Sequence, residues 1–422
     1  MFREISFHST LAAAVRQSAL LAAGVWALAC APAAPDDRVL TGLDVLVRDS
    51  MAPLRGLRVG LITNHTGVAT VGDSTVSGID LLHASPNIEL VKLFGPEHSI
   101  SGRVNAGEAV GDERDPRTGL PVYSLYGETR RPTPEMLAGL DALLFDIQDV
   151  GSRYYTYAWT MALALQAAAQ AGLTFVVLDR PNPIGGELVQ GDVLDTAFAS
   201  FVGLHAVPMR HGLTVGELAG LLNGELGWGA RLTVIPVENW HRNQWYDDTG
   251  LSWVPPSPNM PSLESATHYP GTCLFEGTNL SVGRGTEAAF QQIGATWLDS
   301  DALVGRLQAQ HIPGVRFEAL RFTPHQPGDD KFPEQEVRGV RFVTTDRAAY
   351  DPARTAIAAL VEIRALHPDS LRFQAAHFDR LAGTDQVRQQ LLAGRSATEI
   401  TAPWAAQLQR FDAIRRKYLL YD

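Results

Sequence analysis

Two glutamates in this chain stand where acid–base chemistry could use them. Glu97 follows Pro96 just after the apolar run 88–94, and Glu276 follows the apolar trio 273–275 and precedes a glycine. Hydrolysis of a glycosidic bond uses such a pair, since one carboxylic acid protonates the leaving oxygen while the other carboxylate acts as base or nucleophile. We predict that Glu97 and Glu276 are the catalytic pair. Their spacing in sequence leaves the retaining, inverting and substrate-assisted routes open.

Further polar side chains follow two other apolar runs. Asp146 lies in the run 142–147, which Arg153 follows, and Asp179 and Asn182 follow the run 173–178. A carboxylate, a guanidinium and an amide held between prolines could bind sugar hydroxyls and a charged group. Simpler roles stay open: a helix cap or a partner of Arg103 for Glu97, a salt bridge to an arginine for Asp146, and a chain reversal at Asn182.

The elements that carry these residues predict an α/β fold. Strand and helix signals alternate from about residue 42 to 186, which favours βαβ units and a Rossmann-like parallel sheet. Ligands bind such sheets beyond the carboxyl ends of the strands, so the three loops should converge on one site. No G-x-G-x-x-G follows the first strand, and we therefore expect neither NAD nor another cofactor.

The second half of the chain has a different character. The segment 240–284 is dense in Pro, Asn, Ser, Thr and Gly and contains Asn259 and Arg284. Loops this long are usually functional or disordered, and the aromatic content argues against disorder. Strands are predicted over 315–322 and 336–344, and helices over 352–367 and 404–418. We predict a Rossmann-like catalytic domain at 38–264 and a smaller α+β domain at 265–422 that closes the cleft.

Composition narrows the range of partners. The chain has 422 residues, 45% of them hydrophobic, and a formal net charge of -11. An acidic chain disfavours nucleic acid or an anionic membrane as partner, because such surfaces attract clustered Lys and Arg. Metal-ligand spacings such as H-x-x-x-H and C-x-x-C are absent, so no metal site is predicted.

The amino-terminal residues predict export. Arg3 and Arg16 precede an Ala/Leu-rich stretch that ends at Cys30. Residues 1–30 are therefore predicted to be a signal peptide, with a lipobox-like end that makes Cys30 the lipidated first residue, although Ala27 stands where Leu is usual. A plain cleaved signal is the alternative. The expected location is the periplasm or the cell surface, with a lipid anchor as the contact to the membrane.

Six motifs, read in order, resemble one known family. They are 60–67 (GLITNHTG), 95–98 (GPEH), 146–155 (DIQDVGSRYY), 179–183 (DRPNP), 257–261 (SPNMP) and 276–286, which contains EGTN and GRGT. Together they are similar to the exo-β-N-acetylmuramidase (NamZ-type) family of glycoside hydrolases, formerly a domain of unknown function. The resemblance runs from about residue 42 to the terminal Tyr-Leu-Leu-Tyr. One departure is Ser99, where the family usually has glycine after Pro-Glu-His.

The resemblance implies a fold and an activity. It implies a Rossmann-like domain that holds the active site and a second domain beside it. The implied reaction releases N-acetylmuramic acid from the non-reducing end of peptidoglycan fragments, with Glu97 as the leading catalytic candidate. The motif residues Asn64 and His98 are expected at the substrate. Arg153, Arg210 and Arg284 are the candidate cations for the lactyl carboxylate of the sugar.

Two other functions fit the same residues. A surface lipoprotein that captures muropeptides without turnover would use the same two-domain cleft. A metal-assisted hydrolase would use Asp146, Asp149 and His98, although the spacing of these residues is not that of common metal ligands.

Overall fold

The computed structural model describes residues 37–72, 74–104, 107–108 and 111–422. The predicted signal peptide and Cys30 lie outside the described residues. Residues 39–422 form one compact unit. None of the helices in the described ranges has both the length and the apolar character needed to cross a membrane.

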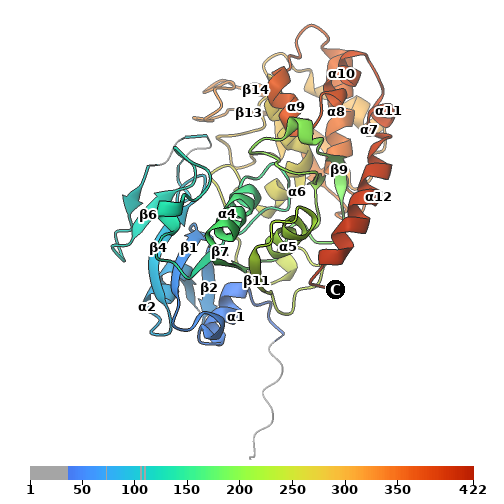
Figure 1. Cartoon of the computed structure of the whole chain (residues 1–422). Helices are drawn as coiled ribbons and strands as arrows, with labels where there is room; N and C mark the ends of the chain where they lie inside the picture. Colours follow the sequence, from blue (N-terminus) through green and yellow to red (C-terminus); the bar gives the residue numbers. More distant parts are fainter. Residues whose placement is uncertain (1–36, 73, 105–106, 109–110) are drawn as a thin grey trace, which may run out of the picture. The chain divides into compact units, whose positions relative to one another are not determined.

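A seven-stranded sheet organises the first part of the chain (Figure 1). Its strands, in spatial order, are β11 (Arg231–Ile235), β8 (Thr174–Leu178), β7 (Ala142–Asp146), β1 (Arg58–Thr63), β4 (Glu89–Gly95), β6 (Pro121–Ser124) and β5 (Glu113–Arg114). Every pairing is parallel except that of β5 with β6. The chain reverses its direction of travel across the sheet after β6, so β1 separates β4 from β7. This is the order of a doubly wound fold, whose ligand crevice lies at the reversal.

The central strands are buried on both faces, which explains their continuous apolar sequences. In β7, Leu143 and Phe145 belong to one hydrophobic cluster, whereas Ala142 and Leu144 belong to another. Alternate residues of a strand point to opposite faces, so helices must cover both. The first cluster includes α4 (Tyr157–Ala171) and α5 (Val215–Glu225), and the second includes α1 (Gly42–Arg48) and α2 (Gly78–Ala84). The predicted α/β class and the three predicted buried strands are confirmed.

Smaller elements complete this part. They are α3 (Pro134–Leu137), the hairpin of β2 (Val68–Val71) with β3 (Ser74–Ser77), and the antiparallel pair of β9 (Gln190–Val193) with β10 (Pro208–Arg210). Helix α4 ends at Gly172, whose φ of 68° is the left-handed conformation that glycine adopts most readily.

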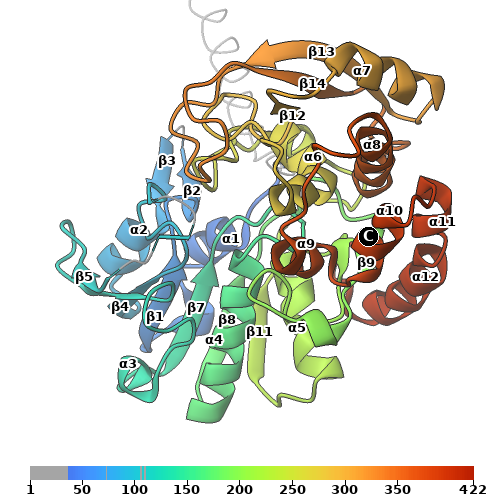
Figure 2. The same ribbon diagram turned by 90° about the horizontal axis from the view of Figure 1, so that it is seen from above.

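The second part is a smaller α+β arrangement, as predicted. A three-stranded antiparallel sheet has the order β12-β14-β13, and Figure 2 shows β13 and β14 beside α7. The elements are α6 (Leu263–Thr272), β12 (Gln292–Ala295), α7 (Ser300–Ala309), β13 (Val315–Phe322), β14 (Val337–Thr344), α8 (Pro352–Leu366), α9 (Ala375–Ala382), α10 (Gln386–Leu392), α11 (Ala397–Thr401) and α12 (Trp404–Arg415).

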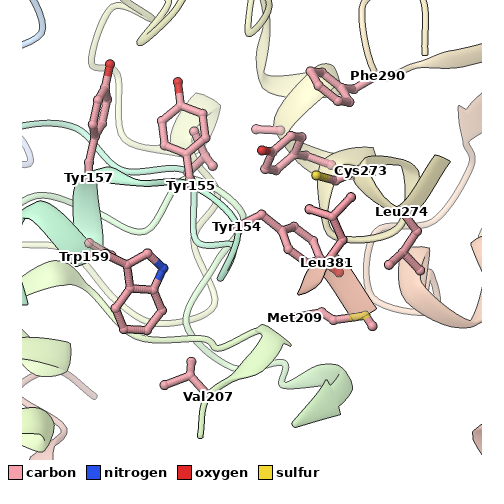
Figure 3. Close-up of a cluster of buried hydrophobic side chains, with 14 of the residues drawn as sticks. Tyr154, Tyr155, Tyr157, Trp159, Val207, Met209, Cys273, Leu274, Phe290 and Leu381 are labelled. Atoms are coloured by element: carbon pink, nitrogen blue, oxygen red, sulfur yellow. The ribbon is translucent and has the colours of Figure 1, made fainter. Parts of the chain in front are cut away.

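One hydrophobic cluster runs through both parts. Figure 3 shows Tyr154 and Met209 of the first part close to Leu381 of the second, and Trp159 and Leu274 belong to the same cluster. Helix α12 also packs on β9, so the end of the chain returns to the first part. The two parts therefore share a core, and the cavity described next is built on it.

Candidate active site

A cavity of about 520 Å³ lies where the two parts meet. Its lining consists of residues 97, 98, 107, 126, 130, 154–157, 200–202, 257, 259 and 260 of the first part and residues 269, 276, 284, 290, 328, 329, 331, 374, 377 and 380 of the second. Five of the predicted site residues line it: Glu97, His98, Asn259, Glu276 and Arg284. Both predicted glutamates line this cavity, and their catalytic roles stay predictions.

Glu97 lies just after the end of β4, and two hydrogen bonds fix its carboxyl group. Its side chain is only 7% exposed and accepts two hydrogen bonds, one from the Thr156 hydroxyl (2.6 Å) and one from the Gly107 N–H (3.0 Å). Thr156 is the residue before α4, so the loop after β7 and the loop after β4 together orient this carboxyl group. A reacting group must be fixed in this way to meet its substrate at the correct angle.

The backbone after Glu97 takes an unusual turn. His98 and Ser99 have φ angles of 70° and 62°, in the left-handed region. Glycine adopts this conformation without the steric cost that a Cβ brings, which explains why the family usually has glycine where this chain has Ser99. The His98 Nδ1–H donates to the carbonyl of Val104 (2.6 Å), which leaves Nε2 as an acceptor. Burial lowers the pKa of His98, so its imidazole is neutral near pH 7.

Tyrosines surround Glu97. Burial and the charge of Glu97 raise the pKa of Tyr126 to about 12. Burial likewise raises the pKa of Tyr155 and Tyr157 well above the usual range. These hydroxyl groups therefore stay protonated. The Tyr157 hydroxyl already donates its proton to the Pro256 carbonyl (2.6 Å), which leaves Tyr155 of this pair to donate to an oxygen that gains negative charge. Tyr155 and Tyr157 also form an edge-to-face pair with ring centroids 4.9 Å apart.

Glu276 lies in the second part and is bound to an arginine. The Arg284 Nε donates to its carboxylate at 2.5 Å, and the Cys273 thiol lies 3.6 Å from the other oxygen. Burial raises the pKa of Glu276, but the charge and hydrogen bond of Arg284 outweigh it and hold the pKa below the ordinary value. Glu276 is thus an ionised carboxylate near neutrality, and it does not have the proton that a general acid must supply.

Several polar residues of the cavity escaped prediction from sequence. They are Tyr126, Arg130, Asp329, Lys331, His377 and Arg380. Arg130 lies over the rings of Tyr126 and Phe201, at 5.2 and 4.4 Å from the ring centroids. The stretch Gly-Asp-Asp-Lys at 328–331 was a usable signal, because it places charges and a glycine between two strands.

The other five predicted substrate contacts need correction. Asn64, Asp146, Arg153, Asp179 and Asn182 do not line the cavity, because their side chains bind other parts of the protein. Asp146 pairs with the Arg180 Nε at 2.6 Å, which is the salt bridge left open above. Asn182 donates to the Leu213 carbonyl and accepts from the Ile184 N–H, so it stabilises a chain reversal.

Asn64 and Asp179 also accept hydrogen bonds from within the protein. Asn64 accepts from the N–H and hydroxyl of Thr66, within its own turn. Asp179 accepts from the Thr214 hydroxyl (2.6 Å), the Gly216 N–H (2.8 Å) and the Tyr421 hydroxyl (2.5 Å). It therefore connects the end of β8 to α5 and to the end of the chain.

Arg153 and Arg210 are buried structural cations rather than candidates for a substrate carboxylate. Both are at most 2% exposed. Arg153 donates to backbone carbonyls from β9, from the segment before β10 and from α9. Arg210 donates to Gln190 and to the Ile184 carbonyl. Of the three predicted cations, only Arg284 reaches the cavity.

The metal-dependent alternative gains no support from the geometry. Across the described ranges, no three or more His, Cys, Asp or Glu side chains are grouped so that they could hold a metal ion. Asp146 is instead paired with Arg180.

Two family models match the chain in succession. Residues 59–264 match "Exo-beta-N-acetylmuramidase NamZ, N-terminal", and residues 267–421 match "Exo-beta-N-acetylmuramidase NamZ, C-terminal". The chain belongs to the NamZ family. The resemblance based on six motifs is thereby confirmed.

Individual relatives of the NamZ family agree with this assignment. The chain is 45% identical over 403 residues to the peptidoglycan beta-N-acetylmuramidase NamZ of Bacillus subtilis (strain 168), covering 93% of this chain and 96% of the relative. A solved DUF1343 family protein from Bacteroides fragilis NCTC 9343 has a TM-score of 0.84 at 38% identity, with 92% of this chain and 100% of that chain covered. A second one from the same organism has a TM-score of 0.71 at 32% identity, with 91% and 99% covered.

Behind the cavity of this NamZ-family chain, Asp149 is a buried carboxyl group without a cation. Burial raises its pKa to about 7, although N–H groups of Gly151 and Val150 partly oppose this. The His211 Nε2 lies 4.0 Å from Asp149 Oδ2. Burial lowers the pKa of His211 to about 3, so its imidazole is neutral and supplies no opposite charge.

This environment predicts a pH-dependent stability. In the unfolded chain Asp149 ionises near pH 3.8, whereas in the folded chain it ionises near pH 7. The folded state therefore binds the proton more tightly, and stability falls as the pH rises from about 4 to about 7. We expect Asp149→Asn to gain about 1–3 kcal/mol relative to wild type between pH 5 and pH 8, measured by urea unfolding. If the free energy of unfolding changed with pH in the same way in wild type and in Asp149→Asn, this prediction would be wrong.

Proposed function

We propose that this protein is an exo-acting β-N-acetylmuramidase, a glycoside hydrolase that releases N-acetylmuramic acid from the non-reducing end of peptidoglycan fragments. The observation that carries the proposal is the buried Glu97 carboxyl group, fixed by Thr156 and Gly107 at the wall of a cavity of about 520 Å³. Membership of the NamZ family and the 45% identical Bacillus subtilis relative support the same reaction.

The residues that line the cavity have different roles in this reaction. Glu97 acts on the glycosidic bond as the carboxyl group that exchanges a proton with the leaving oxygen or stabilises the sugar cation. The neutral hydroxyl of Tyr155 donates to an oxygen of the sugar. The aromatic rings of Tyr269 and Phe290, whose centroids are 4.7 Å apart, give the sugar an apolar surface.

Cations on the second part recognise the acidic end of the sugar. N-acetylmuramic acid has a lactyl carboxylate, and the cavity wall contains Arg284, Lys331 and Arg380. Arg284 already binds Glu276 through its Nε, so its remaining N–H groups and those of its neighbours meet the carboxylate. Arg130 supplies a further cation on the opposite wall.

A panel of substrates tests the proposal. We expect wild-type protein to release nitrophenol from 4-nitrophenyl β-N-acetylmuramide at least about 100-fold faster than from the N-acetylglucosaminide, because the latter has no carboxylate for the cations. N-acetylmuramic acid should also appear by mass spectrometry from a muramyl-glucosamine disaccharide. Tight binding of the disaccharide by calorimetry without any product would refute the hydrolase and favour the muropeptide receptor.

The expected site of action is outside the cytoplasm. The signal-like residues 1–30 and the cysteine at their end support export and a lipid anchor at Cys30, and peptidoglycan is itself extracytoplasmic. Incorporation of labelled palmitate into wild type but not into Cys30→Ala is the result expected, and equal labelling would contradict the anchor.

A further inference from the structure

Three carboxylate side chains line the cavity, and their hydrogen bonds differ. They are Glu97, Glu276 and Asp329. Each oxygen of Glu97 has a protein donor, from Gly107 and from Thr156. Glu276 receives the Arg284 guanidinium on one oxygen and the Cys273 thiol on the other. Two of the three carboxylates are therefore occupied by the protein itself.

Asp329 is the exception. Its Oδ1 accepts the backbone N–H of Lys331 at 3.2 Å, which closes a local turn in the loop between β13 and β14. Its Oδ2 is buried, yet no donor among the described residues reaches it. A buried carboxylate oxygen without a donor costs free energy, and such groups in native proteins usually have a partner outside the fold.

The surroundings of Asp329 fit a contact with a neutral donor. Burial raises its pKa, while the charges of Lys331 and Arg284 lower it and that of Glu276 raises it. Lys331 is already engaged, because its Nζ donates to the carbonyls of Glu276 (2.9 Å) and Phe275 (3.4 Å). No guanidinium or ammonium group is thus bonded to Asp329 Oδ2 within the described chain.

We propose that Asp329, which lines the cavity, binds the substrate directly: its carboxylate turns so that Oδ2, which is covered in this structure, accepts a hydrogen bond from an N–H or O–H group of the sugar. This inference rests on the proposed function and adds a specific contact to it. N-acetylmuramic acid offers an acetamido N–H and ring hydroxyls, and it offers them as neutral donors. Asp329, rather than the arginine-bound Glu276, is then the carboxylate of the second part that contacts the sugar.

Asp329→Asn isolates this contact. Asparagine keeps the size of the side chain and, through its carbonyl oxygen, the turn to Lys331, but it then presents an NH₂ group where Oδ2 accepted. We expect kcat/KM for 4-nitrophenyl β-N-acetylmuramide to fall about 10- to 100-fold, the usual effect of losing a hydrogen bond to a charged group. The melting temperature should stay the same or rise, because a buried unpaired carboxylate has been removed.

Asp330→Asn is the matched control. Asp330 is the next residue of the same loop, is exposed and does not line the cavity. Its φ of 55° is a conformation that asparagine tolerates as well as aspartate does. We expect wild-type rates and wild-type stability from this variant. An Asp329→Asn rate equal to that of Asp330→Asn would overturn the proposal, as would a loss of stability in Asp329→Asn that explains its lower rate.

A binding experiment separates this inference from the proposed reaction. Calorimetry with N-acetylmuramic acid needs no turnover, and we expect Asp329→Asn to bind it at least about 10-fold more weakly than wild type and Asp330→Asn do. If wild type binds the sugar, Asp329→Asn binds it at least about 10-fold more weakly and wild type hydrolyses no muramide, the proposed function fails while the contact stands. If wild type hydrolyses muramides and Asp329→Asn binds the sugar equally well, the contact fails while the function stands.

An altered substrate identifies the donor. In an analogue with an ester oxygen in place of the acetamido N–H, wild type and Asp329→Asn should react equally if the amide is the partner. If the roughly 10- to 100-fold gap persists with the analogue, a ring hydroxyl is the partner. Both outcomes support the contact and differ only in its donor.

Discussion

Glu97→Gln should lower kcat/KM for 4-nitrophenyl β-N-acetylmuramide by about 10²- to 10⁴-fold, the range over which a positioned acid or base acts. Glutamine has nearly the same shape and keeps one carbonyl acceptor for Thr156 or Gly107, so the fold should persist. What it loses is the ability to exchange a proton or to stabilise a positive charge. Initial rates of the purified variant measure kcat/KM, and a melting curve shows whether the fold persists.

The control for this variant is a glutamate of the edge strand of the large sheet. Glu113 lies on the short edge strand β5, is exposed and does not line the cavity. Glu113→Gln should therefore keep the wild-type rate. Equal rates from Glu97→Gln and Glu113→Gln would show that Glu97 has no catalytic role.

Arg153→Met should destabilise the protein by about 3 kcal/mol or more, since buried polar groups would lose their partners. The Arg153 guanidinium donates to four backbone carbonyls: Asp192 (2.8 Å), Val207 (2.9 Å), Leu381 (2.7 Å) and Ala382 (3.1 Å). Methionine fills a similar volume but donates to none of them. Removal of a buried charge offsets part of this loss, since burial lowers the pKa of Arg153 and thus disfavours its charged form.

Urea unfolding of Arg153→Met beside Arg55→Met measures this effect. Arg55 is exposed, and its replacement should change stability by less than about 0.5 kcal/mol. If Arg153→Met were as stable as wild type but had a raised KM, Arg153 would instead be a substrate-binding residue. The four carbonyls belong to both parts of the chain, so the expected loss also measures how strongly Arg153 joins them.

Much of the architecture was predictable because it is encoded locally. The runs 88–94, 142–147 and 173–178 are largely apolar, the pattern typical of strands buried on both faces. They became β4, β7 and β8. The strand-end position of Glu97 was predictable for the same reason, because a short loop after a buried strand opens at the edge of the sheet.

Which polar side chain faces the cavity was not encoded locally. Asp146 at the end of β7 and Asp179 after β8 have the composition of site residues, yet each is bound by a partner far away in the sequence. Arg180 holds Asp146, and Tyr421 reaches Asp179. In the same way, Arg284 was predicted to bind a ligand, whereas in the structure its Nε donates to Glu276.

The sequence by itself determined the order of strands and helices, the membership of a family and the turn that carries Glu97. These follow from residue period, burial and motifs that neighbouring residues define. The tertiary structure alone decided which charges are paired: Arg153 with backbone carbonyls and Glu276 with Arg284. It also left one buried oxygen of Asp329 without a donor among the described residues. Pairing depends on distances between segments that are remote in the chain, and the strong preference of buried charges for a partner makes those distances decisive.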